Sequence, residues 1–113
     1  MGAKVLKFYV SNTDVVKHQS VYESIAFAAK RYGMSGVTIY KGIMGYGSSS
    51  VLHSDKFWEF NQKIPLVVEI VDDEQKIRDF LDKIMPWIEM LPKGCLVTVQ
   101  DVEVILQKKG KIK

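Results

Sequence analysis

Residues 65–74 read Pro-Leu-Val-Val-Glu-Ile-Val-Asp-Asp-Glu and predict a strand that runs directly into a helix. Proline is tolerated at the first position of a strand, and the apolar run Leu66–Val71 is typical of a strand interior. Asp72 or Asp73 can cap the helix that follows. Its apolar face is predicted by residues at helical spacing, namely Ile77, Phe80, Leu81 and Ile84.

A second strand and helix are predicted upstream of this stretch. Lys4–Val10 alternates with a period of two, which is typical of a strand, and a polar loop follows over Ser11–Gln19. Ser20 and Glu23 have the spacing of a capping box at a helix start. Gly33 stands where a left-handed C-terminal cap is expected. The helix face between them is predicted by Val21, Ile25, Ala28, Ala29 and Tyr32.

The remaining elements complete a βαββαβ order. Residues 37–43 predict a strand that leads into a long loop. Pro86 disfavours helical geometry at Met85, so the second helix is expected to end or kink there. Final strand segments are predicted at Leu96–Val99 and Val102–Leu106, interrupted at Gln100-Asp101. The order predicts an α+β, ferredoxin-like split fold, with one domain over residues 1–107 and a basic tail over 108–113.

Composition limits the function further. The chain has 113 residues, is 47% hydrophobic and carries a net charge of +3, which is too small to indicate nucleic-acid binding. Cys95 is the single cysteine, and no signal peptide or membrane-spanning apolar run is recognisable. A cytoplasmic protein without membrane insertion is expected. Apolar residues of both parities in the strands predict that the second sheet face is covered by partner subunits; they include Val5, Tyr9, Val67 and Val71.

The sequence lacks the residue patterns that are typical of enzyme active sites and metal-binding sites. His18 and His53 do not pair with Cys95 or with a carboxylate at a metal-ligand spacing, and no nucleophile elbow is present. Asp72, Asp73 and Glu74 are explained by helix N-terminal electrostatics. The best candidate for chemistry is Gly42–Ser50, whose glycines would let backbone N–H groups approach an anion. We therefore predict neither catalytic nor metal-binding residues.

Two segments resemble the PII nitrogen-regulatory proteins. Gly33-Met34-Ser35-Gly36-Val37-Thr38-Ile39, followed by Gly45-Tyr46-Gly47, is similar to the segment at the base of their long loop. Residues 66–74 resemble their strand-to-helix passage. Residues 40–47, His53-Ser54 and residues 68–72 resemble the PII-like family known as domain of unknown function one-ninety, and the similarity extends over residues 4–106.

The resemblance implies a homotrimer that binds an adenine nucleotide in clefts between subunits. By position, Thr38 matches a nucleotide-contacting threonine, and Gly45, Gly47 and Ser48 match the loop base. The phosphate-binding segment of PII is reduced here to Leu91–Cys95, in which Lys93 and Gly94 remain. This reduction argues against a triphosphate site like that of PII and leaves a smaller nucleotide or another anion as alternatives. One extra residue before Gly45 and a serine at Ser49 in place of glutamine are further departures.

The resemblance also implies that the long loop binds a partner, such as a membrane transporter or a metabolic enzyme. The residues predicted to dock there are Tyr46, Ser49, Ser50, His53, Phe57 and Trp58. Residues 46–58 are expected to be mobile in the free protein. Two alternatives stay open: an adaptor that docks on an ion transporter without any ligand, and a small trimeric enzyme with composite sites between subunits.

Overall fold

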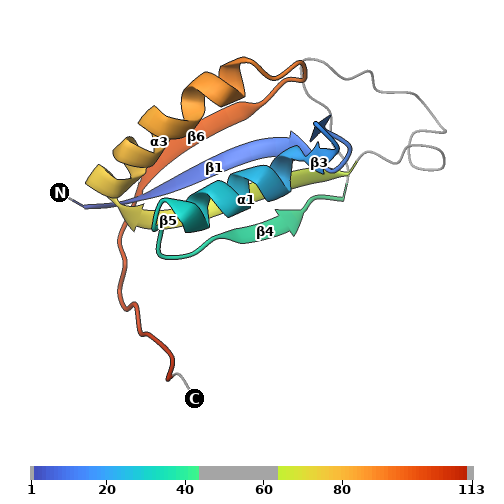
Figure 1. Cartoon of the computed structure of the whole chain (residues 1–113). Helices are drawn as coiled ribbons and strands as arrows, with labels where there is room; N and C mark the ends of the chain where they lie inside the picture. The colour runs from blue at the N-terminus through green and yellow to red at the C-terminus, as the bar shows by residue number, and fades with distance from the viewer. Residues whose placement is uncertain (1, 44–63, 112–113) are drawn as a thin grey trace.

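The computed structural model describes residues 2–43 and 64–111, and it contains one four-stranded antiparallel sheet (Figure 1). The strands lie in the order β4-β5-β1-β6. Their bounds are β1 Ala3–Ser11, β4 Thr38–Lys41, β5 Pro65–Asp73 and β6 Leu96–Val102. The helices α1 (Val21–Arg31) and α3 (Glu74–Glu89) cover one face of the sheet. This order confirms the predicted ferredoxin-like fold. Within the described residues, neither helix is long and apolar enough to cross a membrane.

The hydrophobic core lies between the helices and one sheet face. Every second residue of β1 and β5 points into it, and Leu6, Phe8, Val68 and Ile70 are fully buried. Phe80 of α3 packs edge-on against Phe8, with ring centroids 6.4 Å apart. The opposite parity of these strands faces away from the helices, which leaves one sheet face open in the single chain.

The first helix begins and ends where the sequence predicts, but its start is stabilised differently. The Ser20 hydroxyl donates to the Glu23 carboxylate at 2.6 Å and makes no bond to the helix backbone, so the predicted capping box was wrong. The Val21 N–H instead reaches the Asp14 carbonyl at 2.8 Å. At the other end, Gly33 has a φ of +79°. The N–H of Met34 bonds the Ala29 carbonyl across this left-handed residue, which confirms the predicted cap.

A short hairpin lies inside the segment predicted as a polar loop. Its strands are β2 (Val15–Val16) and β3 (Gln19–Ser20), paired antiparallel. The two turn residues are Lys17 and His18, with φ values of 52° and 68°. Such a turn is usually built from asparagine and glycine, so no local signal in the sequence indicates it.

The second helix passes through its proline. Asp73 is the N-cap, and its carboxylate accepts the Lys76 N–H at 3.0 Å. The prediction was an end or a kink at Met85; the helix continues to Glu89, so the end was wrong. Ile84 and Ile88 are buried on either side of Pro86. Their burial offsets the loss of one backbone hydrogen bond at the proline.

The last strand is continuous, and the chain then leaves the fold. The interruption predicted at Gln100-Asp101 was wrong, because both residues pair with β1 and Lys4 forms an ion pair with Asp101. The strand predicted over Val102–Leu106 was also wrong beyond Val102. Val102 pairs with Ala3, the first residue of β1, and so no partner strand extends further.

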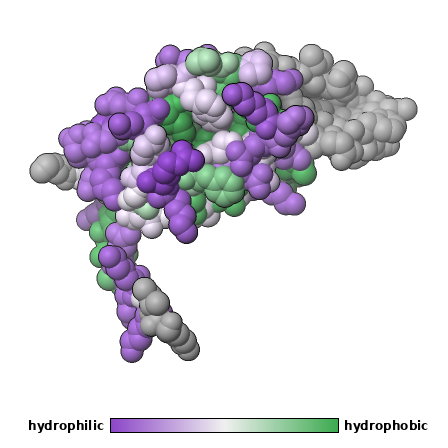
Figure 2. Space-filling model, in the orientation of Figure 1, coloured by the Kyte–Doolittle hydropathy of each residue, from purple (hydrophilic) through white to green (hydrophobic). Residues whose placement is uncertain are grey.

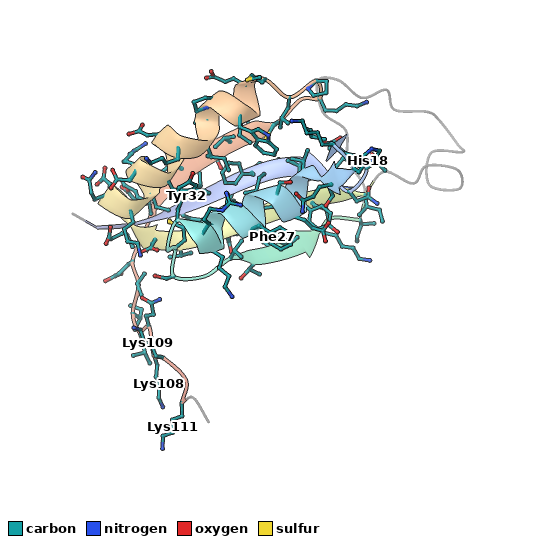
Figure 3. The ribbon with its side chains drawn as sticks, in the orientation of Figure 1. His18, Phe27, Tyr32, Lys108, Lys109 and Lys111 are labelled. Atoms are coloured by element: carbon teal, nitrogen blue, oxygen red, sulfur yellow. The ribbon has the colours of Figure 1, made fainter. Side chains whose placement is uncertain are left out.

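Residues 103–111 form an arm that projects from the body of the protein (Figure 1). Its first half carries the apolar residues Val104, Ile105 and Leu106, and the last two retain 84% and 76% of their accessible surface. Figure 2 shows hydrophobic surface where the arm leaves the body. Its second half carries Lys108, Lys109 and Lys111 (Figure 3). Isolated apolar side chains on such an arm have nothing to pack against in a single chain.

Candidate functional site

The open sheet face carries an apolar row that runs across all four strands. The strand register pairs Tyr40 with Val67, Val67 with Tyr9, and Tyr9 with Leu96. Directly paired residues of antiparallel strands point to the same face, so these four side chains stand side by side. Three of them are exposed: Tyr9 by 39%, Tyr40 by 42% and Leu96 by 59%. The second apolar face predicted from the sequence is therefore present.

A polar row lies beside the apolar one. The register pairs Thr38 with Glu69, Glu69 with Lys7, and Lys7 with Thr98. The Lys7 ammonium is 3.9 Å from the Glu69 carboxylate, and the Tyr40 hydroxyl donates to the same carboxylate at 3.5 Å. Thr38 is exposed at the end of this row, on the edge strand β4.

Of the predicted ligand-binding residues, the structure describes Thr38, Lys93 and Gly94, which lie on opposite sides of the sheet. Lys93 and Gly94 precede β6, which forms one edge of the sheet, whereas Thr38 lies on β4 at the other edge. Two strands separate them. Neighbouring strands lie about 4.8 Å apart, so the two edges are about 14 Å from each other. Within one chain, Thr38 and Lys93 are therefore separated by about the width of the sheet.

The base of the long loop lies at the same end of the sheet as Lys93. β4 ends where Lys41 pairs with Leu66, and β6 begins beside Tyr9. The Gly42 N–H bonds the Pro65 carbonyl at 2.8 Å, and a Cβ on Gly42 would lie 3.2 Å from the Pro65 ring. The other predicted loop residues lie outside the described residues, as does the segment predicted to be mobile; they are Gly45, Tyr46, Gly47, Ser48, Ser49, Ser50, His53, Phe57 and Trp58.

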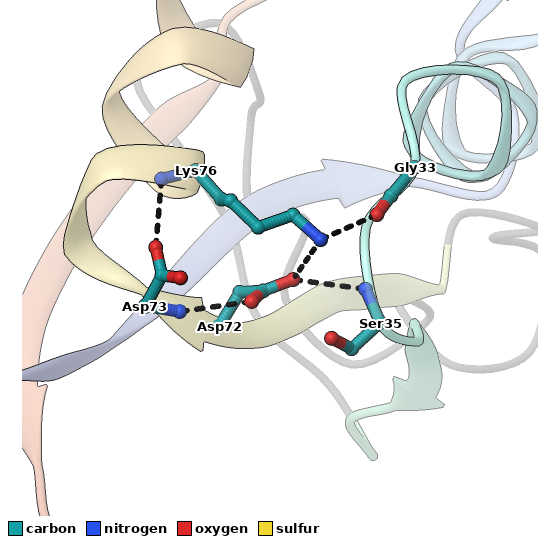
Figure 4. A network of polar contacts seen from close by, with 5 residues as sticks. All are labelled: Gly33, Ser35, Asp72, Asp73 and Lys76. Atoms are coloured by element: carbon teal, nitrogen blue, oxygen red, sulfur yellow. Dashed lines mark hydrogen bonds and ion pairs between the residues drawn. The ribbon is translucent and has the colours of Figure 1, made fainter.

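A network of polar contacts, which the sequence analysis did not predict, fixes the turn that leads into β4 (Figure 4). The Asp72 carboxylate accepts the Ser35 N–H at 2.9 Å and lies 3.5 Å from the Lys76 ammonium. Lys76 also donates to the Gly33 carbonyl at 2.6 Å. Asp72 therefore ties the turn after α1, which leads into Thr38, to the start of α3. Sequence reasoning attributed Asp72 to helix electrostatics, because its bond to Ser35 joins residues 37 positions apart in the chain.

The same contacts shift the pKa of the Asp72 carboxyl group. Burial by itself raises the pKa of this carboxyl, but hydrogen bonds from the Ser35 and Asp73 backbones and the charge of Lys76 outweigh it. The net effect is a pKa below the ordinary value. The ionised form therefore stabilises the fold above the unfolded-state pKa of about 3.9, and this contribution is lost as the pH falls through the folded-state pKa.

Asp72→Asn should lower the free energy of unfolding at pH 7 by about 1–2 kcal/mol, since a partly exposed charge network is weakened. Urea unfolding followed by circular dichroism at pH 7 and at pH 2 measures this loss. The difference from wild type should be smaller at pH 2, because the contribution of the ionised carboxylate is lost as the pH falls through the lowered pKa of Asp72. Asp82→Asn, a change at an exposed site on the same helix, is the control. An equal loss at both pH values would contradict the assignment.

Cys95 lies next to Gly94 and is partly buried. Burial, with a smaller contribution from the negative charge of Asp14, raises the pKa of its thiol to about 11. The thiol is therefore protonated near neutral pH and is a poor nucleophile. His18 is exposed at the tip of the β2–β3 hairpin (Figure 3). In the part of the chain that the structure describes, the polar and charged side chains named above are suited to binding a ligand.

Comparison with solved structures identifies the fold. The chain resembles CPII, a nitrogen regulatory PII-like protein from Thiomonas intermedia K12, solved with ADP, AMP and bicarbonate. The TM-score is 0.63 at 18% sequence identity, over 94% of this chain and 96% of CPII. A chain from Thermus thermophilus, described among PII-like signaling proteins, matches with a TM-score of 0.60 at 18% identity, over 93% and 94% of the two chains. The fold is thus that of PII-like proteins.

Comparison of sequences identifies the family. A protein named UPF0166 from Aquifex aeolicus is 32% identical over 90% of this chain and 92% of its own length. A UPF0166 protein from Methanocaldococcus jannaschii is 35% identical over 90% of this chain and 91% of its own. The model of the DUF190 family, described as an uncharacterized ACR, matches residues 3–104. These matches confirm the resemblance seen in the sequence, and the chain belongs to the DUF190 family.

Proposed function

We propose that this protein is a regulatory oligomer, without enzymatic activity, that binds an adenine nucleotide between subunits. Thr38 of one subunit and Lys93 of its neighbour would contact the same ligand. Gly94 and the loop residues Gly45, Gly47 and Ser48 would complete the site. The observation that carries this proposal is the position of Thr38 and Lys93 on opposite edges of one sheet. Edge-to-edge assembly would bring Thr38 of one subunit close to Lys93 of the next, so that both could contact one ligand.

The exposed apolar surface supports an oligomer, which we propose is a trimer. The row of Tyr40, Val67, Tyr9 and Leu96 occupies a sheet face that no helix of the described residues covers. The apolar half of the C-terminal arm is a second surface of this kind. Burying such surface contributes about 25 cal/mol for each Å² removed from water. Assembly through the open face would cover the row and bring edge strands of neighbouring subunits together.

A nucleotide with one or two phosphates suits the site better than a triphosphate does. CPII, which shares the fold, was solved with ADP and AMP. In this chain the segment before β6 offers one cation, Lys93, to an anionic group. Backbone N–H groups at the glycines of the loop base would add donors without added charge.

The signalling step would be a change in the long loop. A ligand shifts a conformational equilibrium only by its difference in affinity for the two states. We propose that the nucleotide favours one arrangement of the loop, whose residues then dock on a membrane transporter or a metabolic enzyme in the cytoplasm. The docking residues would be Tyr46, Ser49, Ser50, His53, Phe57 and Trp58.

Lys93→Ala should weaken binding of ADP or AMP by about ten- to a hundredfold, the value of a charge-assisted contact. Isothermal titration at two salt concentrations measures the effect, which should be smaller at high salt because the contact is screened. Lys109→Ala, a lysine of the C-terminal arm, removes the same charge and is the control.

Gly47→Val tests the loop base in the same titration. It should abolish binding and leave the oligomer intact, since a side chain there would block close approach to the ligand. If neither nucleotide binds the wild-type protein at millimolar concentration, the proposed sensor is wrong and the ligand-free adaptor is favoured.

A further inference from the structure

A groove lies between the two helices, on the side of the molecule away from the open sheet face. It has a volume of about 330 Å³. Figure 2 shows hydrophobic surface in the strip between α1 and α3, with hydrophilic residues on both sides. We call it the helix groove; it is lined by Val16, Lys17, Gln19, Ser24, Phe27, Ala28, Arg31, Tyr32, Lys83, Ile84 and Trp87.

The walls of the helix groove combine aromatic surface with positive charge. α1 contributes Ser24, Phe27, Ala28 and Arg31, whose spacing places them on one face of the helix. α3 contributes Lys83 and Trp87, one turn apart. Phe27 retains 53% of its accessible surface, although a phenyl ring is stabilised by burial. Figure 3 labels Phe27 on α1 and Tyr32, the residue that follows the helix.

The charged residues that line the helix groove are all positive. Lys17, Arg31 and Lys83 line it, and no carboxylate stands among the lining residues. Within residues 2–43 and 64–111, none of these three cations has an ion-pair partner; the four ion pairs there belong to Lys4, Lys7, Lys76 and Arg78. Three unpaired cations around an apolar depression attract an anion, and their mutual repulsion falls when one binds.

Lys17 lines the groove from the β2–β3 hairpin, where its backbone is strained. Lys17 and His18 both have positive φ, a region that residues with a Cβ avoid. Asparagine and glycine would form this turn with less strain. The sequence thus places a cation in a strained turn next to the groove. Strain of this kind is often found at binding sites.

We propose that the helix groove binds a small organic anion with a flat, apolar body and one acidic group. The body would lie against Phe27 and Trp87, and the carboxylate, sulfonate or phosphate would be held by Arg31 and Lys83. Lys17, in the hairpin before α1, adds positive charge at the other end of the groove. A volume of about 330 Å³ suits a molecule of one or two rings. The groove is separate from the proposed nucleotide site, because it lies in the helical layer and is complete within one chain.

Two fluorescent probes of nearly the same shape test the proposal. Anilinonaphthalene sulfonate carries one negative charge, and N-phenylnaphthylamine is its uncharged counterpart. The wild-type protein should bind the sulfonate with one site per chain. Arg31→Gln and Lys83→Gln should each weaken binding of the sulfonate by about tenfold and change binding of the neutral probe by less than about twofold. Phe27→Ser should weaken binding of both probes.

Matched controls separate the groove from other surfaces. Lys30→Gln, on α1 but outside the groove lining, removes the same charge and should leave binding of both probes unchanged. Circular dichroism of each variant checks that it is folded, and Lys83, exposed on α3, can be changed without touching the core.

Displacement of the sulfonate probe identifies what the groove recognises. Benzoate and phenyl phosphate should displace it, whereas inorganic phosphate alone should not, because it lacks the apolar body. The proposal is overturned if Arg31→Gln and Lys83→Gln bind the sulfonate as wild type does. It is also overturned if Lys30→Gln weakens binding as strongly as they do. These outcomes are independent of nucleotide binding, which the Lys93→Ala titration measures.

Discussion

Val67→Lys is expected to leave the chain folded and to dissociate the oligomer. Val67 stands between Tyr9 and Tyr40 in the apolar row of the open sheet face, so its side chain does not contribute to the core under the helices. A lysine buried there without a partner costs about 3–5 kcal/mol at each interface. That cost raises the dissociation constant by roughly a thousandfold.

Light scattering coupled to size exclusion at micromolar concentration measures the result. Wild type should elute with three times the chain mass of 12.9 kDa, and Val67→Lys with the mass of one chain. Gln75→Lys, which adds the same charge at an exposed position of α3, should remain a trimer. A monomeric wild-type protein, or an unchanged mass for Val67→Lys, would refute assembly through this face.

Phe80→Ala is expected to destabilise the fold by about 3–5 kcal/mol, a large part of the roughly 5–15 kcal/mol typical of a domain. Phe80 is 1% exposed and is packed edge-on against Phe8. The centroid of its ring also lies 6.1 Å from that of Tyr32. Truncation leaves a cavity where α3, α1 and the sheet meet, because the neighbouring side chains relax only in part.

Urea unfolding at a fixed protein concentration gives the magnitude. Phe27→Ala is the matched control, because it removes the same ring from a position that is 53% exposed and should cost less than about 1 kcal/mol. If the two variants unfolded at the same urea concentration, Phe80 would not have the role in the core that its burial indicates.

The sequence determined the strands and helices wherever local signals agreed. The alternating pattern around Leu6, Phe8 and Val10 and the helical spacing around Ile77 and Phe80 predicted the face of each element that is buried in the core. Gly33 marked the end of α1, because only a residue without a Cβ adopts its φ of +79° without strain. The family resemblance rested on the same segments and was confirmed.

The predictions failed where pairing or packing overrode local preference. Gln100 and Asp101 are poor strand formers, but the register with β1 and the Lys4 ion pair keep them in β6. Beyond Val102 the apolar residues favour a strand, yet β1 has ended and offers no partner. Pro86 stays inside α3 because Ile84 and Ile88 are buried around it.

For the candidate site, the sequence by itself determined which residue types are available: Thr38, a glycine-rich segment, and Lys93. Only the tertiary structure decided that Thr38 and Lys93 lie on opposite edges of the sheet, and that Arg31, Lys83 and Lys17 gather around one groove. The physical reason is that strand order and helix packing are set by contacts between residues far apart in the chain. Local periodicity specifies which face of an element is buried, but it does not specify the neighbour against which that face packs.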